Sequence, residues 1–281
     1  MVRARRRRGM IALPLCLLLA GGGAYAAVRY IQESQTLVRE RCTAVAGAES
    51  FDLAPDQAAN AALIAGISVQ RGLPPRAASI ALATAIQESK LRNLDHGDKA
   101  GLDSRGLFQQ RPSQGWGSEA EVMDPVYAAN RFFTELEKVD GYEQMAVTEA
   151  AQRVQRSAYP AAYADHEAEG RAFASALTGQ SPAALDCVLK RPTAAGDPAT
   201  VQAHLSASYP GLDQVTRDGT VTVAAAGATG WAVAQWAVAS ADELQIESVA
   251  YAGLGWTRRD GGWEPGGPNT GNVVITLAGE P

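Results

Sequence analysis

The segment that most constrains the fold spans residues 76–89, where small and branched apolar residues run almost without interruption up to Glu88. Pro74 and Pro75 precede it, and proline suits the first turn of a helix because the N–H group it lacks would have no helical partner there. The segment is apolar on every face, so it predicts a helix buried in a core. A carboxyl group held against apolar surface has a raised pKa and can act as a general acid near neutral pH. Glu88 is therefore a candidate general acid.

A second motif follows at residues 104–110, with the sequence Ser-Arg-Gly-Leu-Phe-Gln-Gln. Gly106 lets the backbone approach a ligand closely, because glycine has no side chain beyond its hydrogen. Gln109 can both donate and accept hydrogen bonds. The motif therefore predicts a turn able to hold a polar ligand.

The two motifs together resemble the catalytic core of lysozyme-like lytic transglycosylases. In that family a Glu-Ser pair at a helix end precedes a Gly-Leu-aromatic-Gln or Gly-Leu-Met-Gln turn, and here Glu88-Ser89 precedes Gly106-Leu107-Phe108-Gln109. The resemblance implies cleavage of the β-1,4 bond between N-acetylmuramic acid and N-acetylglucosamine in peptidoglycan, with Glu88 as the acid and base. It also implies that Gly106 and Gln109 hold the sugar. The alternative is that Glu88 is an ordinary solvated helix glutamate.

Residues 151–160 read Ala-Gln-Arg-Val-Gln-Arg-Ser-Ala-Tyr-Pro and resemble a variant seen in actinobacterial lysozyme-like domains. More familiar transglycosylases have Tyr-Asn near this place, where Gln155 and Ser157 stand here. Tyr163 follows shortly after. The resemblance covers roughly residues 50–185 and implies that Gln155 and Tyr163 line the substrate cleft. Ordinary packing and capping is the alternative for all three side chains.

Residues 91–117 form a long connection rich in Asp, Gly, Ser and Pro, and connections of this length inside a domain are usually functional. Trp116 is a candidate for stacking on a sugar face, or else a plug over a surface hollow. Asp95, Asp98 and Asp103 are either turn residues or candidates for a second catalytic carboxylate. A hydrolytic lysozyme uses two carboxyl groups, whereas a lytic transglycosylase needs one. Their spacing does not place them relative to Glu88.

The N-terminus carries a cluster of five arginines followed by an apolar run over residues 10–20. The arginines contribute +5 to a net charge of −5, so the rest of the chain carries −10. An acidic body argues against nucleic-acid binding, which needs a basic surface. The N-terminus is either an uncleaved membrane anchor, which we favour, or a signal peptide cleaved after Ala26. Both interpretations place the body outside the cytoplasm.

Beyond the apolar run the chain has two cysteines, Cys42 and Cys187. An even pair in an exported chain favours a disulfide over two separate buried thiols. Such a bridge would tie the entry of the intervening domain to its exit.

Residues 190–198 have the composition of a linker, and beyond them residues 199–281 predict a small unit of helices and strands. Its helix-then-strand run, with Trp256 and Trp263 around Asp-Gly-Gly, resembles a module of exported cell-wall proteins related to zinc D-Ala-D-Ala carboxypeptidases. Those enzymes typically carry His-x-His on the last strand, whereas residues 271–275 contain no histidine and His204 is the only one after the linker. Zinc needs three or four suitable ligands, so we expect a metal-free, non-catalytic module for wall binding or packing.

The sequence thus predicts a mainly α lysozyme-like domain and a small α/β C-terminal domain, preceded by one N-terminal apolar helix. The expected divisions are residues 1–30 for the arginine cluster and anchor or signal peptide, 31–189 for the lysozyme-like domain, 190–198 for the linker and 199–281 for the C-terminal module. The expected function is cofactor-free peptidoglycan cleavage, by a lytic transglycosylase or muramidase outside the cytoplasm. The expected partners are glycan strands and, through the N-terminal helix, the membrane. The alternative is a non-catalytic lysozyme-like protein that binds the wall or acts as a scaffold.

Overall fold

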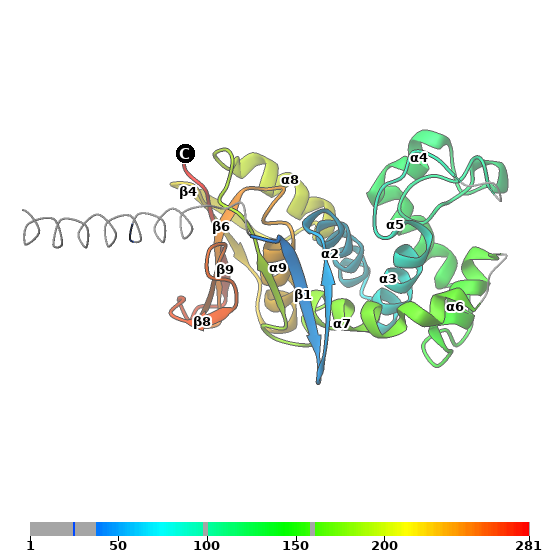
Figure 1. Cartoon of the computed structure of the whole chain (residues 1–281), viewed down its shortest axis with the longest axis horizontal. Helices are drawn as coiled ribbons and strands as arrows, with labels where there is room; N and C mark the ends of the chain where they lie inside the picture. Colours follow the sequence, from blue (N-terminus) through cyan, green and yellow to red (C-terminus); the bar gives the residue numbers. More distant parts are fainter. Residues whose placement is uncertain (1–24, 26–37, 98–100, 158–160, 281) are drawn as a thin grey trace, which may run out of the picture. The chain divides into compact units, whose positions relative to one another are not determined.

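A computed structural model of the protein describes residues 25, 38–97, 101–157 and 161–280. Contacts divide the chain into residues 1–39 and a compact body of residues 40–281, whose helices and strands are drawn in Figure 1. The α-helices of the described residues are α2 (Pro55–Gln70), α3 (Pro75–Ser89), α4 (Glu119–Met123), α5 (Pro125–Leu136), α6 (Val147–Gln155), α7 (Glu167–Leu177), α8 (Pro198–Ser208) and α9 (Gly227–Ala239). Two short 3₁₀ helices are η2 (Pro112–Gln114) and η3 (Ala162–His166).

The described strands form two sheets in which every pair of neighbours is antiparallel. The smaller sheet has the order β2-β1-β3 and is made of β1 (Arg41–Ala46), β2 (Glu49–Leu53) and β3 (Leu185–Val188). The larger sheet has the order β4-β5-β9-β6-β7-β8 and is made of β4 (Gln214–Arg217), β5 (Thr220–Ala224), β6 (Ile246–Tyr251), β7 (Leu254–Thr257), β8 (Trp263–Pro265) and β9 (Asn272–Leu277).

The prediction of a mainly α domain with an appended α/β unit is wrong, because strands occur in both halves of the described chain and the fold is α/β. The strands that the sequence analysis missed are short. In β1, for example, the inward alternation consists of Cys42 and Ala44 alone. An alternation this brief gives almost no periodic signal beside long apolar helices. The sequence-based prediction therefore failed on the small sheet.

The predicted N-terminal apolar helix falls on residues 9–28, which lie outside the described residues except for Tyr25. Among the residues that the structure does describe, no helix is both long enough and apolar enough to cross a membrane. The membrane anchor thus stays a prediction.

The disulfide between Cys42 and Cys187 is confirmed. The two cysteines are direct partners across β1 and β3, and both are fully buried. The bridge closes a loop of 145 residues, which includes α2 to α7 and both predicted catalytic motifs. It therefore joins the entry and exit of this region through adjacent strands of one sheet.

Helix α9 lies between the larger sheet and the helices α2 and α7 (Figure 1). Its side chains are buried on nearly every face, and it contains a fully buried glutamine, Gln235. The amide oxygen of Gln235 accepts hydrogen bonds from the backbone N–H groups of Ala184 and Leu185, at 2.9 and 2.8 Å. Its amide nitrogen donates to the carbonyl of Ala176 at 2.7 Å, at the end of α7. One side chain of the C-terminal half thus satisfies buried backbone groups of the N-terminal half.

Helices α3 and α7 pack closely because small residues face each other between them. A side-chain carbon added at Gly170 of α7 would lie 2.8 Å from the backbone nitrogen of Ala83 on α3. Such a distance is a clash, so glycine is needed for this helix pair to approach. The packing of α3 on α7 is thus set by core residues outside the candidate site.

Loss of the disulfide should strongly destabilise the folded protein. We expect the double variant Cys42→Ala, Cys187→Ala to lose about 5 kcal/mol of unfolding free energy, because in the chain-entropy model a long closed loop restricts the unfolded chain most. Urea denaturation of the two proteins, with and without a reductant, checks this. The reductant should bring the parent to the stability of the variant. Equal midpoints for the parent in both conditions would contradict the prediction.

The variant Gln235→Leu should lose at least about 2 kcal/mol of unfolding free energy, because it leaves several buried backbone groups without partners at about 1–3 kcal/mol each. The measurement is denaturant unfolding followed by circular dichroism. Gln70→Leu, at the exposed end of α2, is the matched control and should change the midpoint little. A Gln235→Leu protein as stable as the control would show that these bonds contribute nothing net.

Candidate functional site

Glu88 lies in the last turn of α3 and is half-buried. The helix ends directly afterwards because Lys90 and Leu91 adopt left-handed backbone conformations, with φ of 53° and 56°. Two side chains of α2 accommodate this unusual ending. Gln57 donates to the carbonyl of Lys90 and Asn60 to that of Leu91, both at 2.8 Å. The position of the candidate acid is thus fixed by a capped helix end.

The turn at residues 105–110 is held against α3 and α6 by side chains that bind its backbone carbonyls. Ser89 donates to the carbonyl of Leu107 at 2.7 Å, and Gln155 donates to that of Phe108 at 2.8 Å. The rings of Phe108 and Phe132 stack with centroids 4.7 Å apart, which fastens the turn to α5 as well. The Glu-Ser pair and the glycine turn, recognised separately in the sequence, are therefore bonded to each other.

Gly106 serves the close packing of the turn on α4. Its φ is 78°, and a side-chain carbon there would lie 2.2 Å from the carbonyl oxygen of Val122. Gly106 itself is buried and does not line the hollow beside Glu88. Gln109 does line that hollow and has a left-handed backbone with φ of 47°, which is unusual for a residue with a side chain. Of the two predicted sugar contacts, Gln109 therefore lines the hollow and Gly106 does not.

A hollow of about 470 Å³ opens beside the end of α3. Four predicted site residues line it, namely Glu88, Gln109, Trp116 and Gln155. The other lining residues are mostly polar: Gln87, Leu94, His96, Gly97, Gly101, Ser104, Gln110, Arg111, Gln114, Arg156 and Ser157. Hydrogen-bonding groups in this number suit a ligand rich in hydroxyl and amide groups.

Tyr163 reaches Glu88 from a fully buried position on η3. Its hydroxyl donates a hydrogen bond of 2.6 Å to Oε1 of Glu88. Burial raises the pKa of Tyr163 above its usual value, the nearby charge of Glu88 and this bond raise it further, and a side-chain hydrogen bond with Ser157 opposes them. The phenol therefore stays protonated and remains a donor to Glu88 at neutral pH. The two residues are adjacent in space although 75 positions separate them.

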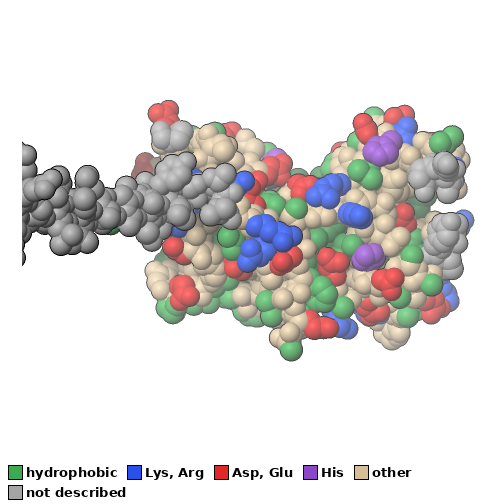
Figure 2. All heavy atoms as spheres, in the orientation of Figure 1, with side chains coloured by type: hydrophobic (Ala, Val, Ile, Leu, Met, Phe, Trp, Pro, Cys, Tyr) green, Lys and Arg blue, Asp and Glu red, His purple; other side chains and the backbone are tan. Residues whose placement is uncertain are grey.

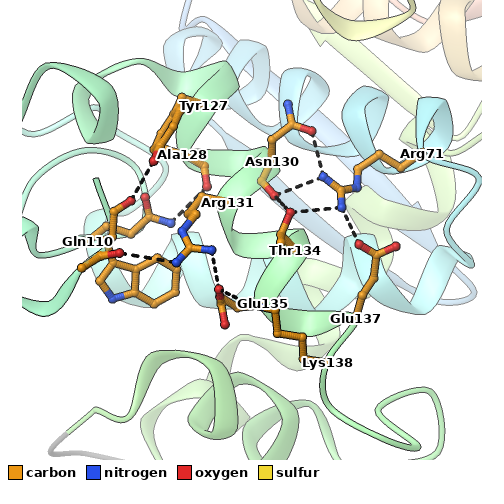
Figure 3. A network of polar contacts seen from close by, with 12 residues as sticks. Arg71, Gln110, Tyr127, Ala128, Asn130, Arg131, Thr134, Glu135, Glu137 and Lys138 are labelled. Carbon is orange, nitrogen blue, oxygen red and sulfur yellow. Dashed lines mark hydrogen bonds and ion pairs between the residues drawn. The ribbon is translucent and has the colours of Figure 1, made fainter. Parts of the chain in front are cut away.

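Trp116 is half-buried, and the guanidinium carbon of Arg131 lies 5.7 Å from its ring centroid. Figure 3 shows the polar network around Arg131, which pairs with Glu135 and so connects to Lys138. The hydrogen bond from Lys138 and the charge of Arg131 lower the pKa of Glu135 despite partial burial. Glu135 is consequently an ionised partner of two cations and no candidate for a general acid.

Of the three predicted aspartates the structure describes Asp95 and Asp103, and neither lines the hollow beside Glu88. Asp95 is exposed and lies 2.9 Å from Nδ1 of His96, and Asp98 is not described. Asp103 accepts hydrogen bonds from the backbone of Ser113 at 3.0 Å and from Arg111 at 2.9 Å. These bonds lower the pKa of Asp103. Asp103 thus orients an arginine that lines the hollow.

A further titratable group, His166 at the end of η3, contacts Gln87, which lines the hollow. Nε2 of His166 lies 3.1 Å from the amide oxygen of Gln87, and its Nδ1 lies 3.7 Å from Glu169. Burial raises the pKa of Glu169, while the charge of His166 acts in the opposite direction. The sequence analysis found no role for His166, because its neighbours come from another helix.

A second hollow, of about 340 Å³, shares four lining residues with the first, namely Gln114, Trp116, Gln155 and Arg156. Arg131 and Glu135 line it too, and their i,i+4 spacing was a signal that sequence reasoning overlooked. No comparable signal marks Arg156. Figure 2 shows that acidic and basic side chains are intermingled over one face of the body. Within the described ranges, no group of three or more His, Cys, Asp or Glu side chains is arranged to hold a metal ion.

Comparison of the chain with protein-family models and with curated proteins gives no match.

Tyr163 should ionise only well above pH 10, where an ordinary tyrosine titrates. We expect the difference in phenolate absorbance between the parent and Tyr163→Phe to stay flat through pH 10, because burial and Glu88 raise the pKa of this phenol. The pKa of Tyr163 is higher in the folded than in the unfolded protein, so its contribution to the stability of the fold is complete at pH values below the unfolded pKa. This contribution decreases as pH rises toward the folded value. A step in this absorbance difference near pH 10, while both proteins are still folded, would contradict the raised pKa of Tyr163.

Proposed function

We propose that this protein cleaves the glycan strands of peptidoglycan, with Glu88 as the acid and base of a lytic transglycosylase reaction. The observation that supports it best is the contact between Glu88 and Tyr163 at the wall of a polar hollow. A buried, protonated phenol holds Oε1 of the carboxyl group in one orientation. Glu88 therefore combines a fixed geometry with access to a ligand, as general acid catalysis requires.

The reaction begins when protonated Glu88 donates its proton to the oxygen of the bond between N-acetylmuramic acid and N-acetylglucosamine. The bond between the anomeric carbon and that oxygen breaks, and positive charge develops on the sugar ring. The hydrogen bond that Tyr163 donates to Oε1 keeps the carboxyl group oriented while it transfers this proton. The carboxylate then takes the proton of the sugar's own 6-hydroxyl, whose oxygen bonds to the anomeric carbon. An anhydro sugar leaves, and Glu88 is protonated again.

A reaction of this kind needs one carboxyl group, whereas hydrolysis by a lysozyme uses two. Among the described residues that line the hollow, Glu88 is the one acidic side chain. Among the described residues that line the adjoining hollow, the acidic one is Glu135, and it is already paired with Arg131 and Lys138. This arrangement favours the intramolecular acceptor over water.

The rest of the lining fits a neutral sugar chain. Gln109 and Gln155 bring amide groups to the hollow, and sugars present hydroxyl and acetamido groups to such side chains. Trp116 offers an aromatic surface where the two hollows meet. The disulfide is consistent with a protein outside the cytoplasm, where peptidoglycan lies.

The variant Glu88→Gln should lose activity on purified peptidoglycan by about 10²–10⁴-fold, since glutamine has the shape of glutamate but no proton to transfer. Mass spectrometry of the soluble products is the measurement. The parent should release anhydro-muropeptides. Glu149→Gln, which removes an exposed carboxylate paired with Arg153 on α6, is the control and should retain activity.

Other outcomes would reject part or all of the proposal. Reducing-end products from the parent would mean that water is the acceptor. Full activity in Glu88→Gln would remove Glu88 from the mechanism. Saturable binding of the parent to peptidoglycan with no released fragment would indicate a scaffold or binding protein instead.

A further inference from the structure

The two hollows adjoin each other, because Gln114, Trp116, Gln155 and Arg156 line both of them, and together they are called the groove below. The candidate acid lies in the larger hollow only. A chain-like ligand that places a bond at Glu88 therefore has further units within reach of the smaller hollow. The place where the two hollows meet is distinguished by its charge.

Three arginines from the described residues line the groove, and two of them are neutralised by acidic partners. Arg111 bonds to Asp103 at 2.9 Å, and Arg131 pairs with Glu135. Arg156 makes no ion pair with any residue of the described ranges, and its side chain is exposed. Among the described residues, it is therefore the arginine that brings a positive charge without an ion-pair partner to the place where the two hollows meet.

The backbone places Arg156 there. Helix α6 ends at Gln155, and Arg156 has a left-handed conformation with φ of 52° and ψ of 40°. Its N–H group donates to the carbonyl of Gln152 at 2.8 Å, which closes the helix. The side chain of Gln155 is at the same time bonded to the carbonyl of Phe108. These bonds hold the base of the Arg156 side chain in place at the groove, so little backbone ordering is left for ligand binding.

We propose that Arg156 binds a carboxylate carried by the glycan, so that the groove selects strands whose acidic substituents are intact. This inference rests on the proposed function, because the sugar backbone of peptidoglycan is neutral. Its negative charge lies on the attached peptide or, where the peptide is absent, on the lactyl group of muramic acid. A guanidinium group matches a carboxylate with two parallel hydrogen bonds. Glu88 and Trp116 would engage the sugars, and Arg156 the substituent of a muramic acid.

The test measures affinity for soluble glycan oligomers with full-length protein carrying Glu88→Gln, so that no cleavage occurs during binding. Three oligomers are compared: one with intact peptide stems, one with the stems removed to leave the lactyl carboxylates, and one whose carboxylates have all been converted to amides. Arg156→Asn removes the charge and suits the left-handed backbone. Arg156→Lys tests whether charge alone is enough. Arg153→Asn, an exposed arginine on the same helix, is the matched control.

We expect Arg156→Asn to weaken binding of the stem-bearing oligomer about tenfold and to leave binding of the amidated oligomer unchanged. Arg156→Lys should recover part of the affinity, and higher salt should shrink the difference. An effect that persists on stem-free glycan means that Arg156 accepts the lactyl carboxylate as well as a peptide carboxylate, whereas an effect lost on that glycan assigns the carboxylate to the peptide. Arg153→Asn should bind all three oligomers like the parent.

Two outcomes would overturn the inference, and they are distinguishable. If the parent binds all three oligomers and Arg156→Asn binds them equally well, selection by Arg156 is excluded while the proposed function stands. If the parent binds none of them, the proposed function itself fails, and the inference fails with it.

Discussion

The close packing of α3 against α7 is the constraint on which the cleft depends. Gly170 permits it, because any side chain there would meet the backbone of Ala83. Helix α3 ends at the candidate acid, and η3, which precedes α7 directly, carries Tyr163. The acid and its hydrogen-bond donor are therefore brought together by one helix pair. Both residues lie on helices, so core packing sets their contact of 2.6 Å.

Side-chain bonds to backbone carbonyls fix the rest of the site. Ser89 and Gln155 bind consecutive carbonyls of the turn, and the buried Gln110 donates to the carbonyl of Ala128 on α5 at 3.0 Å. A left-handed residue such as Gln109 persists only where its surroundings determine its conformation. The turn is anchored to three helices, and this is what allows Gln109 to project from it at the groove.

The sequence predicted helix α3 well, because its apolar pattern is long. The helix expected over residues 76–89 is observed over Pro75–Ser89. The small sheet was missed, since its strands are short and β3 lies far from β1 and β2 in the chain. The motifs correctly brought Glu88 and Gln109 to one hollow, but Arg156 depends on a left-handed turn for which the sequence carries no marker.

The C-terminal half takes part in holding this site, which is more than an appended module would do. Trp263 donates to the carbonyl of Leu185 at 2.9 Å, and Trp256 donates to Asp186 at 3.1 Å, so both tryptophans bind the strand that carries Cys187. Trp256 is fully buried, and a buried indole offers no face to a sugar. Together with Gln235, these side chains satisfy polar groups of β3 and of the segment after α7. The two tryptophans that suggested a wall-binding module thus have a structural use, and this favours the packing role for the C-terminal half.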